Sequence, residues 1–253
     1  MELLFILLKN KIMDYKALHK LSYGLYIVAS QFEGRKAGYV ANTVFQVTSS
    51  PAQLAISCHK KNETTGIILE SGVFSVSVLK KELDIKIIGD FGFMSSSDID
   101  KFASVKTSNS VSGAPIVMDE SVAWFGCKVV QNLDLGSHIL LVGEILDGQI
   151  LSDEEPLSYA YYREKYKMFS PKNAPTYVDP EHLKVAEQKE EASTQTVEET
   201  QYEEHICIIC GFKYNEEEGD PTVGIEPGTR FADLPDDYKC PICNASKDYF
   251  RKA

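Results

Sequence analysis

The chain has 253 residues, of which 43% are hydrophobic and 25% charged, and a formal net charge of −11. This composition is typical of a globular protein and excludes collagen-like and wholly disordered chains. The sequence contains no run of about 20 apolar residues, the length that crosses a bilayer as a helix. Its acidic balance argues against a nucleic-acid-binding role. We therefore expect a cytoplasmic protein that binds neither membranes nor nucleic acids.

The chain opens with a predicted N-terminal extension over residues 1–13, in which the apolar run from Leu3 to Leu8 is too short for a signal peptide. Residues 14–150 are rich in predicted strands. Five runs of β-branched and aromatic residues are bounded by turn-forming residues: Tyr23–Ala29, Leu54–Cys58, Val73–Leu79, Ala123–Val130 and Ile139–Ile145. We expect short helices at Thr64–Glu70 and within Lys80–Phe93. Many strands with few long helices indicate a β-barrel or sandwich.

The region after the strands divides into a tail and a linker. The tail, Pro156 to Tyr177, is rich in tyrosine and lysine, and we expect it to wrap over the barrel or over a partner subunit. Residues 179–204 carry 2 basic and 9 acidic residues and almost nothing to bury. This composition predicts an acidic flexible linker, with a charged helix as the alternative. In either form it would let a small terminal domain search the surface of its neighbour.

Four of the six cysteines form two C-x-x-C pairs near the C-terminus: Cys207, Cys210, Cys240 and Cys243. A tight turn between cysteines three apart aims both sulfurs at one point, so two such turns complete a tetrahedral four-thiolate site for zinc or iron. A segment this short also has too small a core to fold easily without a metal. The spacing alone leaves a structural zinc ribbon and an iron centre open.

Residues 205–253 as a whole resemble rubredoxins. The resemblance rests on Cys207-x-x-Cys210-Gly211, Tyr214, Gly219-Asp220-Pro221, Ile225-x-Pro227-Gly228-Thr229-x-Phe231, Leu234-Pro235, Cys240-Pro241-x-Cys243 and Lys247-x-x-Phe250. It implies a small rubredoxin-like domain in which the four cysteines hold one iron ion that cycles between Fe2+ and Fe3+. The sequence departs from the family at Tyr238, where rubredoxins usually carry tryptophan.

An ordered set of segments within residues 14–178 resembles the flavin reductase-like family of FMN-binding split barrels, which includes the flavoredoxins. The set comprises Gly38–Thr48, Ile56–Thr64, Ser71–Leu79, Asp100-Lys101-Phe102, Gly113-Ala114-Pro115, Gly136-Ser137-His138 and Gly143-Glu144. The triplet Gly136-Ser137-His138 departs from the family, which has aspartate in place of Ser137. The resemblance implies a mainly β fold: an FMN-binding split β-barrel with short helices. Family members usually pair as homodimers with the cofactor near the subunit interface.

A flavin needs a flat slot, polar groups for the ring edge and a cradle for its phosphate. Backbone amides of residues 42–45 and 56–59 suit the ring edge, and a hydroxyl at a helix start suits a phosphate. The predicted cofactor-binding residues are Asn42, Thr43, Ser57, Cys58, His59, Asn62, Thr64, Lys101 and His138. Plain helix capping is the alternative role for Asn62 and Thr64, and a core thiol the alternative for Cys58 and Cys127. No catalytic side chain is predicted.

The two parts together resemble the high-molecular-weight rubredoxins of anaerobic bacteria. The resemblance implies an oxidoreductase that passes electrons from NAD(P)H through FMN to the iron, and on to an acceptor such as a flavodiiron oxygen or nitric oxide reductase. One alternative is an electron carrier that a separate reductase reduces. The other is a flavin-binding regulatory protein whose C-terminal domain is a structural zinc ribbon.

Overall fold

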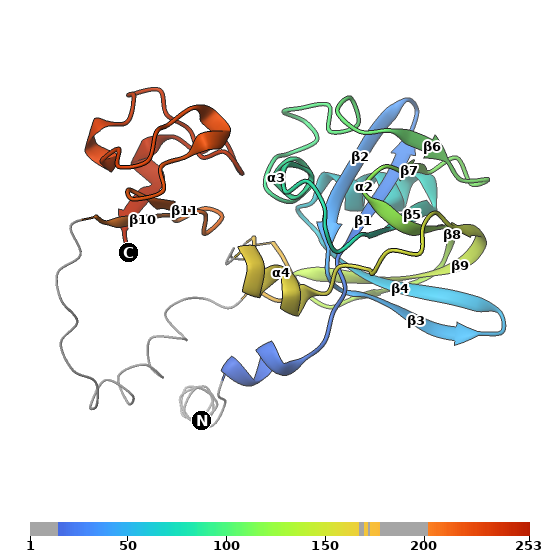
Figure 1. Cartoon of the computed structure of the whole chain (residues 1–253). Coiled ribbons are helices and arrows are strands. Elements are labelled where there is room, and N and C mark those ends of the chain that lie inside the picture. The colour runs from blue at the N-terminus through green and yellow to red at the C-terminus, as the bar shows by residue number, and fades with distance from the viewer. Residues whose placement is uncertain (1–14, 167–169, 172, 178–201) are drawn as a thin grey trace.

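The computed structural model describes residues 15–166, 170, 171, 173–177 and 202–253. The predicted extension over 1–13 and nearly all of the predicted linker lie outside these residues. The described chain forms a large β-rich domain and a small C-terminal domain (Figure 1). Within the described residues, no helix is both long and apolar enough to cross a membrane.

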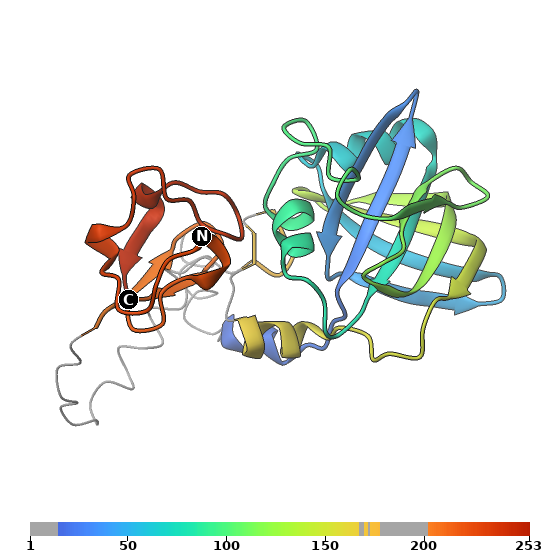
Figure 2. The ribbon, with the colours of Figure 1, turned by 45° about the horizontal axis from the view of Figure 1, so that its top comes forward.

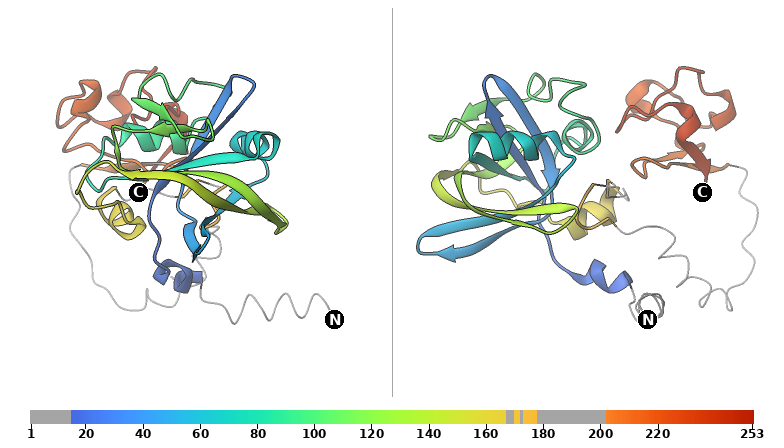
Figure 3. Two further views of the ribbon diagram at one scale, coloured as in Figure 1. Left: turned by 90° about the vertical axis from the view of Figure 1, so that its right-hand side faces the viewer. Right: turned by 180° about the vertical axis from the view of Figure 1, so that it is seen from behind.

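The large domain is built on one antiparallel sheet whose strand order is β2-β1-β5-β8-β9-β4-β3. Its strands are β1 (Tyr26–Phe32), β2 (Arg35–Ala41), β3 (Val44–Ser49), β4 (Ala52–His59), β5 (Val73–Leu79), β8 (Ser121–Asp134) and β9 (His138–Ile150). A separate two-stranded sheet pairs β6 (Thr107–Asn109) with β7 (Pro115–Val117). Figure 3 shows the long β8–β9 pair bending across the domain.

All five predicted strands are present. The strand at Val73–Leu79 has the predicted bounds, whereas the strands at β8 and β9 run well beyond the apolar runs that predicted them. The extra length follows from pairing, because β8 and β9 continue their ladder through exposed polar residues. The sequence did not predict β2 and β3. The mainly β split-barrel fold class is confirmed.

Alternation of side chains along the strands separates two apolar clusters. Along β1, Val28 belongs to the interior cluster, while Ile27 and Ala29 belong to the cluster on the outer face. The interior cluster takes side chains from β1, β2, β4, β5, β8, β9 and the helix α2 (Glu63–Ser71). The sheet therefore closes around a core of its own, as a barrel requires.

The outer cluster is covered by two short helices, α3 (Lys86–Gly92) and α4 (Tyr159–Tyr166). The α4 segment is tied to the start of the barrel, because the Leu25 N–H donates to Leu157 and the Tyr159 N–H donates to the Tyr23 carbonyl, both at about 2.9 Å or less. A 3-10 helix, η1 (Tyr15–Lys20), precedes the barrel. The tyrosine-rich tail thus folds back onto the barrel, as expected.

The small domain contains a three-stranded sheet of order β11-β10-β12, made of β10 (Glu204–Cys207), β11 (Lys213–Asn215) and β12 (Phe250–Lys252). Three 3-10 turns join these strands: η2 (Pro221–Val223), η3 (Phe231–Asp233) and η4 (Lys247–Tyr249). Its core is aromatic, with the rings of Tyr214, Phe231, Tyr238 and Phe250 in mutual edge or tilted contact. Offset and edge-on geometries are those that aromatic pairs favour.

Candidate metal centre and flavin site

The four predicted ligands meet at one point. Cys207 and Cys210 flank the turn after β10, Cys240 and Cys243 flank a second turn, and all four sulfurs lie within 4.8 Å of one another. The Cys207 and Cys243 sulfurs are 3.6 Å apart, and those of Cys210 and Cys240 are 3.5 Å apart. A disulfide needs about 2.05 Å, whereas metal–sulfur bonds of about 2.3 Å place the sulfurs of a tetrahedron about 3.8 Å apart. The geometry fits a tetrathiolate metal site.

Hydrogen bonds among the four cysteines change the pKa values of their thiols. The pKa of Cys207 lies well below its ordinary value because the neighbouring thiols of Cys210, Cys240 and Cys243 donate to its sulfur, and the backbone N–H of Cys210 adds a further hydrogen bond. A thiolate is the form that ligates a metal. The same set of thiol hydrogen bonds raises the pKa of Cys210 and Cys240, so the four ligand thiols titrate together as one cluster.

Tyr238 stabilises the core of the metal domain through a hydrogen bond. The hydroxyl of Tyr238, the residue that replaces the usual tryptophan, donates to the Asp220 carboxylate at 3.1 Å. Both residues are buried. The same carboxylate accepts the Thr222 N–H at 3.2 Å. Tyrosine therefore keeps the aromatic ring in the core and adds a hydrogen bond that fixes the η2 turn.

In the barrel, the end of β4 and the start of β9 bring two predicted residues together. His59 pairs with His138 in the β4–β9 register, and their rings meet edge to face with centroids 4.8 Å apart. His138 Nε2 lies 3.3 Å from the Asn173 carbonyl, which can only accept, so this nitrogen carries the proton. The Ser137 hydroxyl then donates to Nδ1 at 2.9 Å. Serine thus orients the histidine where the family has aspartate.

The turn between β2 and β3 lies beside β4. The Ser57 N–H donates to the Thr43 carbonyl at 3.2 Å, and the Thr43 hydroxyl donates to the Asn42 side chain at 3.1 Å. The Asn42 amide in turn donates to the Thr176 hydroxyl at 2.6 Å. Asn42 and Ser57 are buried. These contacts place three predicted residues in one hydrogen-bonded group.

Segment 173–177 of the tail covers both of these groups. Its Asn173 carbonyl meets His138, and its Thr176 hydroxyl meets Asn42. Neither tail residue was predicted as a site residue, and the signal available in the sequence was only the composition of the tail, which indicates a covering segment. The tail therefore closes over the side of the barrel where the predicted flavin residues lie.

At the start of α2, one buried polar atom has no hydrogen-bond partner among the described residues. Asn62 is the N-cap, and its side chain accepts the Thr64 N–H at 3.1 Å, which is the capping role considered as an alternative. Thr64 itself is fully buried, and its hydroxyl has no hydrogen-bond partner among the described residues. Buried hydroxyls are nearly always paired. The orphaned hydroxyl at a helix N-terminus therefore fits a phosphate ligand.

Lys101 is a buried cation near this helix start. Its ammonium donates to the carbonyls of Gly38 at 2.9 Å and Phe91 at 3.4 Å, and the side chain is held between β2 and α3. Burial lowers the pKa of Lys101 to about 8, with the carboxylates of Glu63, Asp90 and Asp98 acting in the opposite sense. An ammonium has three donors, so these two bonds leave one for an anion.

The two isolated cysteines are core thiols. Cys58 and Cys127 are fully buried, and burial raises the pKa of Cys58 to about 11 and that of Cys127 to about 12. The Cys58 sulfur lies 2.9 Å from the Tyr39 hydroxyl inside the barrel. A thiol with a raised pKa is a poor nucleophile, so the core role is favoured over a redox role. Tyr39 is a neighbour that the sequence did not single out.

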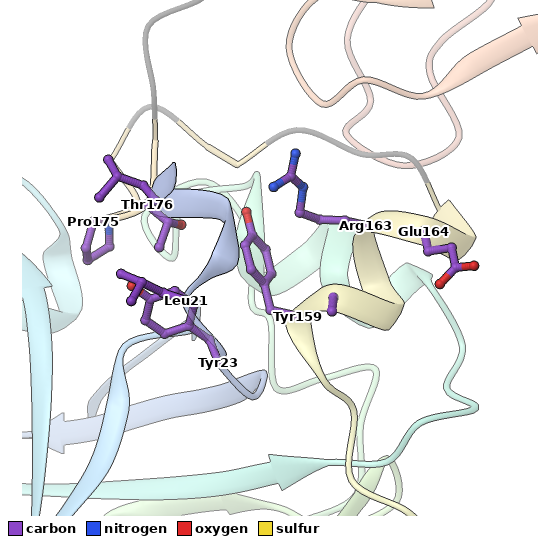
Figure 4. A pocket seen from close by; sticks show the side chains of 9 residues that line it. Leu21, Tyr23, Tyr159, Arg163, Glu164, Pro175 and Thr176 are labelled. Carbon is purple, nitrogen blue, oxygen red and sulfur yellow. The ribbon is translucent and has the colours of Figure 1, made fainter. Parts of the chain in front are cut away.

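A pocket of about 410 Å³ opens beside the tail (Figure 4). Tyr159 and Arg163, one helical turn apart on α4, line one side, and Pro175 and Thr176 line another. Leu21 and Tyr23 from the start of the barrel complete the wall. Because Thr176 also bonds to Asn42, the pocket and the predicted flavin residues share one wall.

Comparison with known proteins identifies both parts. Residues 18–170 match the flavin reductase like domain family, and residues 204–250 match the rubredoxin family. The chain is 40% identical to a high molecular weight rubredoxin of Moorella thermoacetica over 240 residues, which cover 95% of this chain and all of that protein. It is 46% identical over 167 residues to a ferric-chelate reductase (NAD(P)H) of Archaeoglobus fulgidus, covering 66% of this chain and 99% of that one.

The barrel also has relatives among solved structures. An NADH:FAD oxidoreductase of Streptomyces globisporus superposes with a TM-score of 0.51 at 22% identity, covering 56% of this chain and 83% of that one. At this identity the likeness shows the fold alone. The barrel binds a flavin and the four clustered cysteines bind iron, as the two family matches and the site geometry agree. The chain therefore belongs to the flavin reductase like family, carries a C-terminal rubredoxin domain, and is an oxidoreductase.

Proposed function

We propose that this chain takes electrons from NADH or NADPH at its barrel and passes them to its own iron centre, from which an external redox protein collects them. The observation that carries the proposal is the presence of a flavin domain and a rubredoxin domain on one chain, matched over 95% of its length by a high molecular weight rubredoxin. A bound flavin accepts two electrons as hydride and releases them one at a time to the one-electron iron centre.

The flavin site of this proposal is FMN-specific and uses the predicted residues. The orphaned Thr64 hydroxyl and the spare donor of Lys101 bind the phosphate, and both groups are buried. The backbone around Thr43 and Ser57 meets the ring edge, and His59 with His138 closes the end of the slot. The tail residues Asn173 and Thr176 exclude water from this side.

The donor nucleotide belongs to the pocket beside the tail. Its volume of about 410 Å³ lies in the usual range for ligand sites. The Arg163 guanidinium supplies a charge for the nucleotide phosphates, and the Tyr23 and Tyr159 rings offer faces for stacking. The relative from Archaeoglobus fulgidus is named for NAD(P)H, which supports a nicotinamide donor.

The barrel of this proposal works as a homodimer. Five large apolar side chains are exposed on β3, β8, β9 and the turn between β8 and β9, with exposed fractions from 48% at Val47 to 74% at Ile150: Phe45, Val47, Leu133, Leu135 and Ile150. Leu133 and Leu135 are close in sequence at the β8–β9 turn, and exposed apolar patches mark protein contacts. A Leu133→Lys variant is expected to sediment as a monomer, while Val111→Lys, exposed by 75% on a loop outside these strands, keeps the dimer.

The external acceptor is a flavodiiron oxygen or nitric oxide reductase or another redox protein.

An absorption experiment tests the proposal against a pure carrier. The purified protein, mixed anaerobically with NADH or NADPH, is expected to lose first its flavin absorption and then its ferric absorption. If neither nucleotide reduces the flavin, while a separate reductase reduces both the flavin and the iron, the chain is an electron carrier. A colourless protein that holds one zinc ion would point to the regulatory alternative.

A further inference from the structure

The second cysteine turn lies directly on α3 of the barrel. Gly89, in the middle of α3, is buried, and a Cβ placed on it would lie 2.1 Å from the carbonyl oxygen of Ile242 and 3.1 Å from the carbonyl carbon. The three nearest atoms to that position all belong to Ile242. Ile242 is inside the Cys240–Cys243 turn, so a glycine here allows the iron domain's backbone to touch the helix. Figure 2 shows α3 facing the small domain.

The first cysteine turn meets α4. Tyr162 on α4 is only 3% exposed, and the apolar cluster that contains it also contains the four ligand cysteines of the small domain. The pKa of Tyr162 is raised chiefly by burial, and further by Tyr159 and by the nearby Cys210 thiol. Both turns that hold the iron ligands thus face the barrel. On α4, Tyr162 lies on the side toward the iron domain, whereas Tyr159 and Arg163 line the pocket.

The contact is apolar in character. Every ion pair between described residues joins two groups of the same domain. Because no ion pair between described residues crosses the contact, we expect its strength to depend little on salt concentration. All four ligand cysteines are buried.

We propose that the two cysteine turns are the docking face of the iron domain, that α3 and α4 of the barrel receive this face for electron transfer, and that an external acceptor must displace it. The proposal rests on the proposed function. In each docking event one electron would pass from the reduced flavin to the iron, so that the flavin is oxidised by one electron as Fe3+ becomes Fe2+. The two electrons of one hydride therefore leave in two events, between which the acceptor removes an electron from the same face.

Gly89→Ala isolates this contact. Alanine favours a helix over glycine, so the substitution does not weaken α3 itself, yet its Cβ collides with Ile242. Gly92→Ala, on the same helix, is the matched control, because a Cβ there makes only ordinary contacts within the large domain, at 3.6 Å with Val40 and 3.8 Å with Ile88. Both variants are made in the full chain with iron and flavin bound.

Hydrogen exchange detected by mass spectrometry gives a readout that does not depend on activity. In Gly89→Ala we expect peptides covering residues 206–212 and 240–245, and those of α3, to exchange at least tenfold faster than in the wild type, which corresponds to about 1.4 kcal/mol of lost docking. Peptides of β5 stay unchanged, and Gly92→Ala matches the wild type. Equal exchange in all three proteins overturns the docking proposal.

Stopped-flow mixing with NADH or NADPH provides a second test of the docking proposal, with the flavin and ferric absorptions as its readouts. In Gly89→Ala the flavin is expected to bleach at the wild-type rate, while the ferric absorption disappears at least tenfold more slowly. Wild-type iron reduction in Gly89→Ala contradicts the docking proposal. If the wild-type flavin is not reduced by either nucleotide, the proposed donor is wrong, and the exchange experiment still decides on docking.

Discussion

The Asn42 amide donates to the Thr176 hydroxyl at 2.6 Å across 134 positions of sequence, and this bond fixes the tail over the β2–β3 turn. With the Asn173 carbonyl on His138, it makes the tail a wall of the candidate flavin site. Closure of such a wall excludes water and strengthens polar contacts inside the site.

The first prediction concerns this wall. Thr176→Val removes the acceptor for Asn42 and leaves a buried amide unpaired, at a cost of about 1 kcal/mol. We therefore expect the dissociation constant for FMN to rise about fivefold, measured by fluorescence titration of the flavin-free protein. Thr107→Val, on the exposed strand β6, is the control and should bind FMN as the wild type does. Equal affinity in both variants would show that the tail does not close the site.

The second prediction follows from the buried ammonium of Lys101, whose pKa is about 8 because burial disfavours its charge. An anionic phosphate needs the protonated form, so FMN affinity should fall as pH rises above about 8, by at most tenfold per unit. The stability of the flavin-free protein should change in the opposite direction. Between pH 8 and the ordinary lysine value of 10.5, the unfolded chain binds more protons, so stability rises with pH.

Lys101→Met tests both parts together. This variant should bind FMN weakly, with little pH dependence between 8 and 10.5, and should lose the rise in stability seen in denaturant titrations over the same range. A wild-type pH profile of FMN affinity in Lys101→Met would remove Lys101 from the phosphate site.

The metal domain yields a third prediction through Tyr238. Tyr238→Phe removes the hydrogen bond to the buried Asp220 carboxylate, and bonds to charged groups contribute about 1.5–3 kcal/mol. Thermal unfolding followed by the ferric absorption should therefore shift down by several degrees. Tyr249→Phe, with a side chain that is 47% exposed, is the matched control and should unfold as the wild type does. Equal midpoints for the two variants would assign the Tyr238 ring, rather than its hydroxyl, the stabilising role.

The fourth prediction separates the two domains. Cys210→Ser removes one of the four clustered ligands, so the iron is lost and the small domain unfolds, because a domain of this size depends on its metal. The barrel has its own interior cluster and should keep its FMN affinity. Iron content, circular dichroism and flavin titration measure these outcomes, and loss of flavin binding in Cys210→Ser would show that the barrel depends on the small domain.

The metal site was predictable because its ligands lie in two short local turns, and only one long-range contact is needed to join Cys207 with Cys243. The strand β5 was predictable because its small and apolar residues alternate between two faces. The strands β2 and β3 escaped prediction because β2 begins with Arg35 and Lys36, and β3 is exposed along most of its length.

The rest of the flavin site depends on contacts that no local pattern encodes. The acceptors of Lys101 are backbone carbonyls, at Gly38, 63 positions away, and at Phe91, 10 positions away on another element. The residues that close the site, Asn173 and Thr176, come from a tail whose composition alone indicates only a covering segment. The contact between Gly89 and Ile242 joins two domains, and a single glycine in a helix gives no sign of it.

The most direct test of the account is rapid anaerobic mixing of the full chain with reduced nicotinamide, with the flavin and ferric absorptions recorded together. The flavin is expected to be reduced first, and the iron is expected to follow at a rate independent of protein concentration, as transfer within one chain requires. Flavin that becomes reduced while the iron stays oxidised, or an iron step whose rate rises in proportion to protein concentration, would contradict it.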